Sequence, residues 1–326
     1  MRPVAVIPVA GAGTRLKPLT LTTPKALLEV AGKPILAHIL AQVEEAKPEK
    51  VVLVVGPGPQ GQRIIEFAKR GGLRVESVVQ SEPLGLGHAV AQARDLVEGK
   101  PVLIVLGDTI VLASLGEFTS GPSRVGVREV PDPRRFGVAT VRDGKIVALV
   151  EKPEHPDSNL AVVGIYFLKN STLLFQSLRA LEGEGRRTRG EFQLTDALQR
   201  MIDQGEELQP FPVQAWYDCG KTETLLETNR ALLDLQAGPV SRPGVVCLPP
   251  VAIDPSADVL HAVIGPHTSI GPGARVRRAV VQNSIVSQGA TVEDVLLDLS
   301  VVGENAVAQG TYQRLNVGDS SEVKST

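Results

Sequence analysis

The sequence predicts an α/β chain in which a doubly wound, mixed sheet is followed by a small β-solenoid. Three observations predict this. Buried apolar runs alternate with segments of helical spacing near the N-terminus, shorter strands follow in the middle, and a 16-residue repeat appears near the C-terminus. The length of 326 residues favours two domains. A hydrophobic content of 43% with 21% charged residues is typical of a soluble globular protein.

The charge balance argues against several partners. With 34 basic and 36 acidic residues, the formal net charge is −2, which does not suit a nucleic acid or an anionic membrane surface. No apolar stretch is long enough for a membrane span, and the first apolar run, of six residues, is too short for a signal peptide. Two cysteines, Cys219 and Cys247, are too few for a disulfide framework. We therefore expect a cytoplasmic protein.

The first 25 residues carry the strongest local signal. The apolar run Val4–Val9 predicts a buried parallel strand, and a loop with Gly11 and Gly13 follows it. Small residues allow backbone N–H groups to approach a phosphate closely. Arg15 and Lys25 add positive charge suited to phosphoryl oxygens. The sequence therefore predicts an anion-binding loop after the first strand.

The rest of the N-terminal half predicts a parallel sheet. The expected strands are Val51–Val55, Arg74–Val79 and Val102–Leu106, and the expected helices are Pro34–Ala46 and Ala89–Leu96. Ligands of such sheets bind outside the carboxyl ends of the strands. Gly11, Gln80 and Asp108 each follow a strand end, so we expect them to share one crevice.

The middle of the chain has shorter strands before helices return. The expected strands are Val125–Val130, Gly137–Val141, Lys145–Glu151 and Ala161–Leu168, and the expected helices are Leu173–Leu181, Leu194–Gln204 and Thr222–Leu235.

Residues 237–243 read as a linker, and the periodicity changes after it. Repeats of 16 residues begin at Ile270, Val286 and Val302, each with an aliphatic start and Gly or Asn at the fourth place. Such short repeats predict a stacked β-solenoid, and their pattern resembles the left-handed parallel β-helix built from hexapeptide units. A β-sandwich is the alternative. The predicted domains are 1–236, a linker 237–244 and 245–326.

Several glycine-rich motifs compete for the N-terminal loop and its surroundings. A dinucleotide fingerprint would need glycine where Leu16 stands, and prolines interrupt the literal match at Gly56–Gly61. A Walker loop ending in the GKT of 220–222 would need glycine at Ala215. The run G-x-G-T-R-L-x-P-x-T followed by P-K, from Gly11 to Lys25, resembles the signature of sugar-1-phosphate nucleotidyltransferases. A plain strand-to-helix turn is the alternative.

The resemblance implies the nucleotidyltransferase fold, which is a Rossmann-like doubly wound mixed sheet, and it implies roles for particular residues. The implied nucleotide-binding residues are Ala10, Gly11, Gly13, Thr14, Gln80 and Gly85. The implied sugar-binding residues are Gly137, Glu151, Lys152, Val163 and Gly164. The implied catalytic residues are Arg15, Lys25, Asp108, Lys152 and Asp218, with Mg²⁺ on Asp108 and Asp218. TRGEFQLTD, residues 188–196, also resembles the family, without a definite role.

From the residues alone, plainer roles stay open. Asp108 could cap a helix, Glu151 and Lys152 could be a surface pair, and Gln80 could be solvated. A glutamine amide nevertheless offers a donor and an acceptor that match O4 and N3–H of uracil or thymine. His88 shows no metal-ligand spacing and is expected to be structural.

The chain resembles long-form glucose-1-phosphate thymidylyltransferases and uridylyltransferases. IPVAG and GLGHAV resemble the uridylyltransferases, and WYDCGKTETLLETN resembles the long thymidylyltransferases. The expected reaction joins a nucleotidyl group from dTTP or UTP to glucose 1-phosphate. Alternatives are a mannose-1-phosphate guanylyltransferase, another sugar-nucleotide pyrophosphorylase, a non-catalytic sugar-nucleotide sensor, or a second, acyl-transfer activity of the solenoid involving His261 or His267. A homo-oligomer is expected. The base, the sugar, the oligomeric state and feedback regulation are left open.

Overall fold

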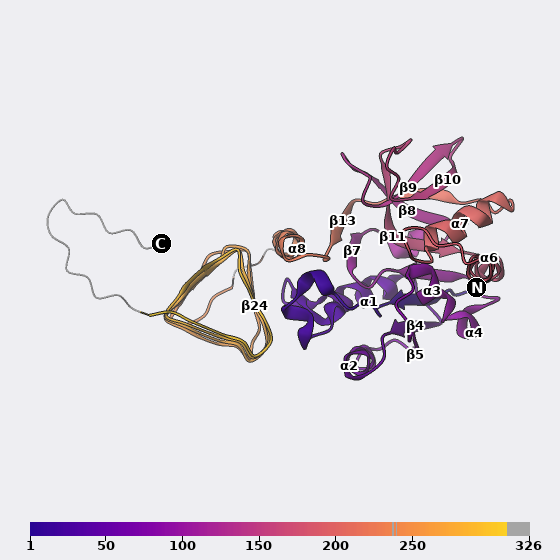
Figure 1. The fold of residues 1–326 in the computed structure, drawn as a ribbon. Coiled ribbons are helices and arrows are strands. Elements are labelled where there is room, and N and C mark those ends of the chain that lie inside the picture. Colours follow the sequence, from indigo (N-terminus) through magenta and orange to yellow (C-terminus); the bar gives the residue numbers. More distant parts are fainter. Residues whose placement is uncertain (237, 239, 312–326) are drawn as a thin grey trace. The chain divides into compact units, whose positions relative to one another are not determined.

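A computed structural model describes residues 1–236, 238 and 240–311, and it divides into two compact units (Figure 1). The first unit comprises Met1–Glu29 and Lys33–Thr228. The second comprises Val30–Gly32 and the described residues from Asn229 onward. Within the described residues, none of the helices combines the length and the apolar composition that crossing a membrane requires.

The first unit is built on a nine-stranded mixed sheet. Its strand order is β10-β9-β11-β6-β1-β4-β5, with β8 beside β11 and β12 beside β8. The strands are β1 (Val4–Pro8), β4 (Lys50–Val55), β5 (Val75–Val79), β6 (Val102–Val105), β8 (Arg124–Glu129), β9 (Gly137–Arg142), β10 (Lys145–Glu151), β11 (Leu160–Leu168) and β12 (Gln209–Pro212). Strand β1 runs parallel to β4 and β6, whereas β11 runs antiparallel to β6. The predicted doubly wound mixed sheet is confirmed.

Helices pack on this sheet through a buried aliphatic core. The helices of the first unit are α1 (Ile35–Glu45), α2 (Pro59–Ala68), α3 (Leu86–Ala91), α4 (Arg94–Val97), α5 (Leu115–Phe118), α6 (Ser171–Gly183) and α7 (Leu194–Asp203). The last helix, α8 (Thr222–Leu235), begins in the first unit and belongs to the second from Asn229 onward. Val4 and Val52 of the central strands are fully buried, and they belong to one core cluster with Val90, Leu178 and Leu198 of α3, α6 and α7. The runs of Val and Leu therefore hold the strand ends in fixed positions.

The predicted helix Ala89–Leu96 is wrong in detail, because the structure has two short helices, α3 and α4, there. The backbone hydrogen bonds between them join residues three positions apart instead of four. Ala93 N–H donates to Val90 O (3.0 Å), and Leu96 N–H donates to Ala93 O (3.1 Å). Short elements also escaped prediction. They include α5, β12, the pair β7 (Thr109–Leu112) and β13 (Ala215–Asp218), the strands β2 (Glu29–Val30) and β3 (Lys33–Pro34), and the 3₁₀ turns η1 (Thr14–Leu16), η2 (Leu19–Leu21) and η3 (Lys25–Leu27).

The second unit contains three sheets of parallel strands whose coils stack as a triangular prism, drawn orange to yellow in Figure 1. The sheets are β14 (Val245–Cys247), β17 (Ala262–Ile264), β20 (Val280–Gln282) and β23 (Leu296–Asp298); β15 (Val251–Ile253), β18 (Thr268–Ile270), β21 (Ile285–Val286) and β24 (Val301–Val302); and β16 (Asp258–Leu260), β19 (Arg275–Arg277), β22 (Thr291–Glu293) and β25 (Val307–Gln309). This arrangement is consistent with the expected left-handed β-helix.

The strand register confirms the 16-residue repeat and shows where it fails. Arg275 pairs with Thr291, and Thr291 with Val307, at a spacing of 16 residues. Asp258 pairs with Arg275 at a spacing of 17, because the earlier coils have three-residue corners, 248–250 and 265–267, where later coils have two. Because of this extra residue the earlier coils do not follow the 16-residue repeat, so the repeat in the sequence was recognised only from Ile270 onward. Residues 237 and 239 of the predicted linker, and 312–326 of the predicted solenoid, lie outside the described residues.

The coils are held by inward aliphatic side chains and by polar contacts with α8. Ile264, Val281 and Val286 are fully buried inside the prism. The Asn229 side chain of α8 is also buried; its Oδ1 accepts from Ala31 N–H (2.8 Å) and Ser269 Oγ (2.6 Å). Charged residues instead point outward in pairs, such as Arg277 with Asp258 (2.6 Å).

Candidate active site

The glycine loop after β1 forms one wall of a cavity of about 370 Å³. Gly13 has φ +60°, and a Cβ there would lie 2.9 Å from Thr20 Cγ2, so the turn needs glycine. Gly11 differs, because a Cβ there would meet no atom within 4 Å and would stand in the cavity. The fold therefore requires Gly13, whereas Gly11 leaves space for a ligand.

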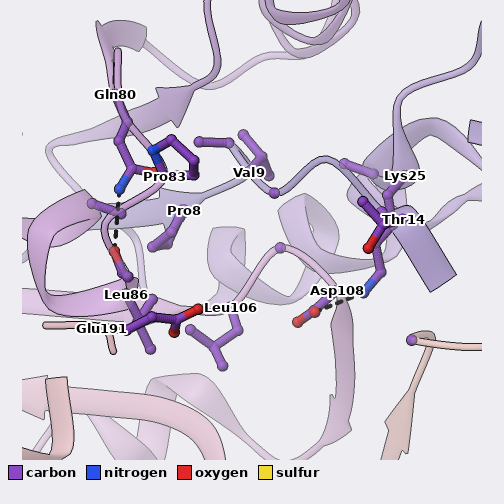
Figure 2. Close-up of a pocket in the computed structure, with 18 of the residues that line it drawn as sticks. Pro8, Val9, Thr14, Lys25, Gln80, Pro83, Leu86, Leu106, Asp108 and Glu191 are labelled. Atoms are coloured by element: carbon purple, nitrogen blue, oxygen red, sulfur yellow. Dashed lines mark hydrogen bonds and ion pairs between the residues drawn. The ribbon is translucent and has the colours of Figure 1, made fainter. Parts of the chain in front are cut away.

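Figure 2 shows this first cavity, which lies at the carboxyl ends of β1, β5 and β6. The predicted residues that line it are Ala10, Gly11, Gly13, Thr14, Arg15, Lys25, Gln80, Gly85 and Asp108. The expectation that Gly11, Gln80 and Asp108 share one crevice is therefore confirmed.

Gln80 is buried, and its amide is held by its neighbours. Nε2 donates to Gly85 O (3.1 Å) and lies 3.0 Å from His88 Nδ1. His88 Nε2 in turn lies 3.2 Å from Gln92 Nε2, so the histidine has the structural role that was expected. Because Nε2 is engaged within the protein, Oε1 is the group of this amide that could accept a hydrogen bond from a ligand. This changes the prediction, in which both groups of the amide faced the base.

A second cavity of about 310 Å³ is lined by the predicted residues Gly137, Glu151, Lys152, Val163, Gly164 and Asp218. The register of β11 shifts between Val162 and Tyr166, and Gly164 at this bulge has φ +85° with Leu106 against it. Glu151 is fixed by two contacts: Thr195 Oγ1 donates to its Oε2 (2.7 Å), and Lys152 Nζ lies 3.1 Å from its Oε1. The carboxylate and ammonium therefore reach the same cavity together.

The two cavities adjoin each other. The residues that line both are Arg15, Leu86, Leu106, Asp108 and Glu191. Arg15 and Asp108 thus stand where a ligand in the first cavity would meet a ligand in the second. Such a junction suits a reaction between two bound molecules, because it converts their encounter into a reaction within one complex.

The comparison with known proteins agrees with this geometry. The family model described as nucleotidyl transferase matches residues 4–234. The chain belongs to the nucleotidyl transferase family. It is 32% identical to a glucose-1-phosphate thymidylyltransferase of Streptomyces antibioticus, over 98% of this chain and 99% of that protein.

Two further relatives cover the family domain. The bifunctional protein GlmU of Methanococcus maripaludis is 37% identical over 71% of this chain and 54% of its own length. A crystal structure of UDP-glucose pyrophosphorylase complexed with UDP-glucose matches with a TM-score of 0.62 and 26% identity, over 72% of this chain and 100% of that one. The likeness to the nucleotidyl transferases therefore includes both the sequence and the fold of the first unit.

Three charged groups of this nucleotidyl transferase meet at the junction. Lys25 Nζ forms an ion pair with Asp108 Oδ2 at 2.7 Å, and Thr109 Oγ1 donates to Asp108 Oδ1 at 3.2 Å. Asp218 is brought beside them because it pairs with Thr109 across β13 and β7, and Cys219 N–H donates to Asp108 O (3.0 Å). The direct pairing of Lys25 with Asp108 was not predicted.

The pKa values of the two aspartates shift in opposite directions. Burial acts to raise the pKa of Asp108, but the charge and hydrogen bond of Lys25 outweigh it and hold that pKa below its usual value. Burial raises the pKa of Asp218, and the negative charge of Asp108 raises it further. The two carboxylates therefore repel each other, and the positive charges of Lys25, Arg15 and Arg135 partly offset this repulsion at Asp218.

This pair of carboxylates fits a magnesium ion. Mg²⁺ is commonly held by one or two carboxylates together with water and substrate phosphates, and its charge relieves carboxylate repulsion. Among the described residues, no group of three or more His, Cys, Asp or Glu side chains could hold a metal. Asp108 and Asp218 could thus supply two ligands, and water and a bound phosphate would have to supply the others.

Sequence reasoning assigned no definite role to several residues of the second cavity and its rim, although they stand in motifs that resemble the family. Thr195 and Gln193 come from the TRGEFQLTD segment, and Phe136 packs edge-to-face on Trp216 with ring centroids 4.6 Å apart. Glu191, from the same segment, lines both cavities. The family-like TRGEFQLTD run was a signal for three of these residues, but its pattern did not say which side chains point inward.

The histidines of the solenoid lie at its corners. His261 and His267 have left-handed backbone conformations, with φ of 50° and 53°. His267 Nε2 contacts Asp234 Oδ1 of α8 at 2.9 Å. A left-handed corner and a contact with α8 are structural roles for these two histidines.

Proposed function

We propose that this nucleotidyl transferase transfers a nucleotidyl group from a pyrimidine nucleoside triphosphate, dTTP or UTP, to glucose 1-phosphate and releases pyrophosphate. The observation that carries the proposal is the pair of adjoining cavities. One has a glycine loop with two cations and a buried glutamine, and the other has a fixed carboxylate with an ammonium. The names of the thymidylyltransferase and UDP-glucose pyrophosphorylase relatives support the same donor and acceptor.

The first cavity suits the nucleotide. The backbone of the glycine loop and the guanidinium of Arg15 would hold the triphosphate, and Lys25 would add charge there. Gln80 Oε1 would accept from N3–H of uracil or thymine. Adenine presents an unprotonated ring nitrogen at the corresponding edge, and a site built around a hydrogen bond rejects a mismatched base strongly.

The second cavity suits the sugar phosphate. Glu151, oriented by Thr195, would accept hydrogen bonds from sugar hydroxyls. The Lys152 ammonium would steer the sugar phosphate toward Arg15 at the junction. The attacking phosphate oxygen is already ionised, so no general base is needed, and the residues act by positioning and by neutralising charge.

Mg²⁺ remains part of the proposal, with Asp108 and Asp218 as its protein ligands. When bound, the ion would neutralise charge on the reacting phosphates. Lys25 would then exchange its contact with Asp108 for one with a phosphate oxygen.

The proposal is tested by measuring pyrophosphate release over four nucleoside triphosphates and several sugar 1-phosphates. We expect UTP and dTTP with glucose 1-phosphate to give the highest kcat/KM. Gln80→Ala should reduce use of both pyrimidine nucleotides more than it changes the KM for sugar phosphate. A preference for GTP or ATP would favour a guanylyltransferase or adenylyltransferase, and no release with any pair would favour a sensor.

The cytoplasmic location and the homo-oligomer also remain proposals. An outward row of aliphatic side chains on the solenoid supports the oligomer: Val246, Val263, Val280 and Leu296 are linked by strand register, and Leu296 is 79% exposed. Light scattering on the purified chain would give its mass, and a monomer at micromolar concentration would contradict the oligomer.

A further inference from the structure

Glu191 is a charged residue at the junction to which neither the proposed reaction nor the sequence pattern gives a role. Of the five residues that line both cavities, Leu86 and Leu106 are apolar, and Arg15 and Asp108 belong to the phosphate chemistry. In Figure 2 the Glu191 side chain extends toward Leu106. A carboxylate beside a triphosphate is unfavourable unless it meets a different part of the ligand.

The position of Glu191 is built into the fold. Phe192 N–H donates to Leu84 O (2.8 Å), and Gly87 N–H donates to Phe192 O (2.8 Å), so the segment is fixed on the start of α3. Gly85 permits this approach, because a Cβ there would lie 2.6 Å from Phe192 O and 2.8 Å from Glu191 Cβ. The Glu191 backbone is also paired with Thr188 in both directions (3.0 and 3.2 Å). The carboxylate is therefore held at the cavity wall.

One carboxylate oxygen is left for a ligand. Gln193 Nε2 donates to Oε2 at 3.1 Å. In the part of the chain that the structure describes, Oε1 accepts no hydrogen bond. A carboxylate is an acceptor only, so a matching ligand group must be a donor, and a hydroxyl is the neutral donor that a nucleotide or sugar phosphate carries.

The neighbours of Glu191 indicate which hydroxyl this is. Gly85 adjoins Glu191 and accepts from Gln80, at the end proposed for the base. Arg15 and Lys25 stand at the end proposed for the phosphates. Between a base and its phosphates a nucleotide has only its pentose. We propose, on the basis of the proposed function, that Glu191 accepts a hydrogen bond from the 2′-hydroxyl of the ribose and so favours ribonucleotides over 2′-deoxyribonucleotides.

This inference sharpens the choice between UTP and dTTP. The thymine methyl group alone is worth about 1 kcal/mol, which would separate the two nucleotides only slightly. Loss of a hydrogen bond to a charged acceptor is a larger effect, on the order of tenfold or more in affinity. The pentose, rather than the base, would then decide the preferred donor.

The test compares UTP with 2′-deoxy-UTP, which differ in a single hydroxyl. Binding is measured calorimetrically without sugar phosphate, so that the result does not depend on turnover. We expect the unaltered protein to bind UTP about tenfold more tightly than 2′-deoxy-UTP. Glu191→Ala should weaken UTP binding about tenfold, leave 2′-deoxy-UTP nearly unchanged and bring the ratio close to one. Glu191→Gln, which retains an amide acceptor, should give an intermediate ratio.

The control is Glu182→Ala on α6, an exposed glutamate that lines neither cavity, and it should leave the ratio as it was. An unchanged ratio in both Glu191 variants, with their circular dichroism intact, would overturn the inference. A rise only in the KM for glucose 1-phosphate would also overturn it and assign Glu191 to the hexose. If both nucleotides bind but no pyrophosphate is released with any pair, the proposed function fails while the ratio still tests Glu191.

Discussion

The two units of this chain use backbone irregularity in opposite ways. In the first unit, irregular points form the cavities: the Gly13 turn, the bulge at Gly164 and the left-handed Lys152 (φ 44°) each bring a functional group to a wall. In the second unit, left-handed corners such as Arg278 and Asn283 recur at each coil and keep the strands in register. The difference teaches that irregular backbone can serve either purpose: in the first unit it positions single groups at a cavity wall, and in the second it repeats with the coils and supports the scaffold.

The largest expected effect is on catalytic activity, and it should follow from neutralising an aspartate of the first unit but not one of the second. Asp108→Asn and Asp218→Asn should each reduce pyrophosphate release about 100-fold or more, because each removes charge that balances the reacting phosphates and their metal. The double variant should cost little more than either single one, since residues that act as a unit are not additive.

Asp258→Asn is the matched control, because that aspartate pairs outward with Arg277 in the solenoid (2.6 Å). Its activity should stay close to that of the unaltered protein. Full activity of either Asp108→Asn or Asp218→Asn with Mg²⁺ would contradict the shared metal site.

The second effect concerns the glycine loop. Gly11→Ala places a methyl group in space that the chain leaves empty, so the fold should survive while nucleotide binding weakens about tenfold, or about 1.4 kcal/mol. Gly72→Ala is the control, since a Cβ there also meets nothing within 4 Å but faces solvent. Equal nucleotide affinities of the two variants, measured by calorimetry, would show that Gly11 does not contact the ligand.

The sequence alone could predict the parts of the site that depend on local patterns, but not those that depend on tertiary packing. The apolar strands and the run from Gly11 to Lys25 are local patterns, so their placement at one edge of a parallel sheet followed from general rules. The Lys25–Asp108 ion pair was not predictable, because the two residues are 83 positions apart and depend on tertiary packing. Glu191 escaped for the same reason: its position depends on how its segment docks against Gly85.

The third effect is a moderate one on activity. A chain that ends after Ala237 lacks the coils on which Asn229 and the end of α8 pack, so its thermal unfolding temperature should fall. Because the cavity-lining residues all belong to the first unit, its kcat/KM should stay within about tenfold of the full chain, or about 1.4 kcal/mol of barrier. A truncated chain with native circular dichroism but no pyrophosphate release would instead give the solenoid a part in completing the site.

The smallest expected effect is a difference in the rate at which the two cysteine thiols are chemically modified. Burial raises the pKa of the Cys219 thiol to about 12, and the side chain is fully buried in the first unit, whereas Cys247 of the solenoid is half-buried. At pH 8 iodoacetamide should therefore modify Cys247 well before Cys219, and the Cys219 rate should increase as pH rises toward its pKa. Mass spectrometry of the modified peptides gives both rates, and equal rates in the folded protein would contradict this difference.

The Lys25–Asp108 ion pair affects which charged solutes can bind at the junction. The two charges already satisfy each other at 2.7 Å, so a free anion that captures Lys25 leaves Asp108 without its partner, and a free cation that captures Asp108 leaves Lys25 without its own. A ligand that carries both signs, as a metal–triphosphate complex does, replaces both halves of the pair at once. The pair would thus weaken the binding of simple salt ions at the junction relative to the binding of such complexes.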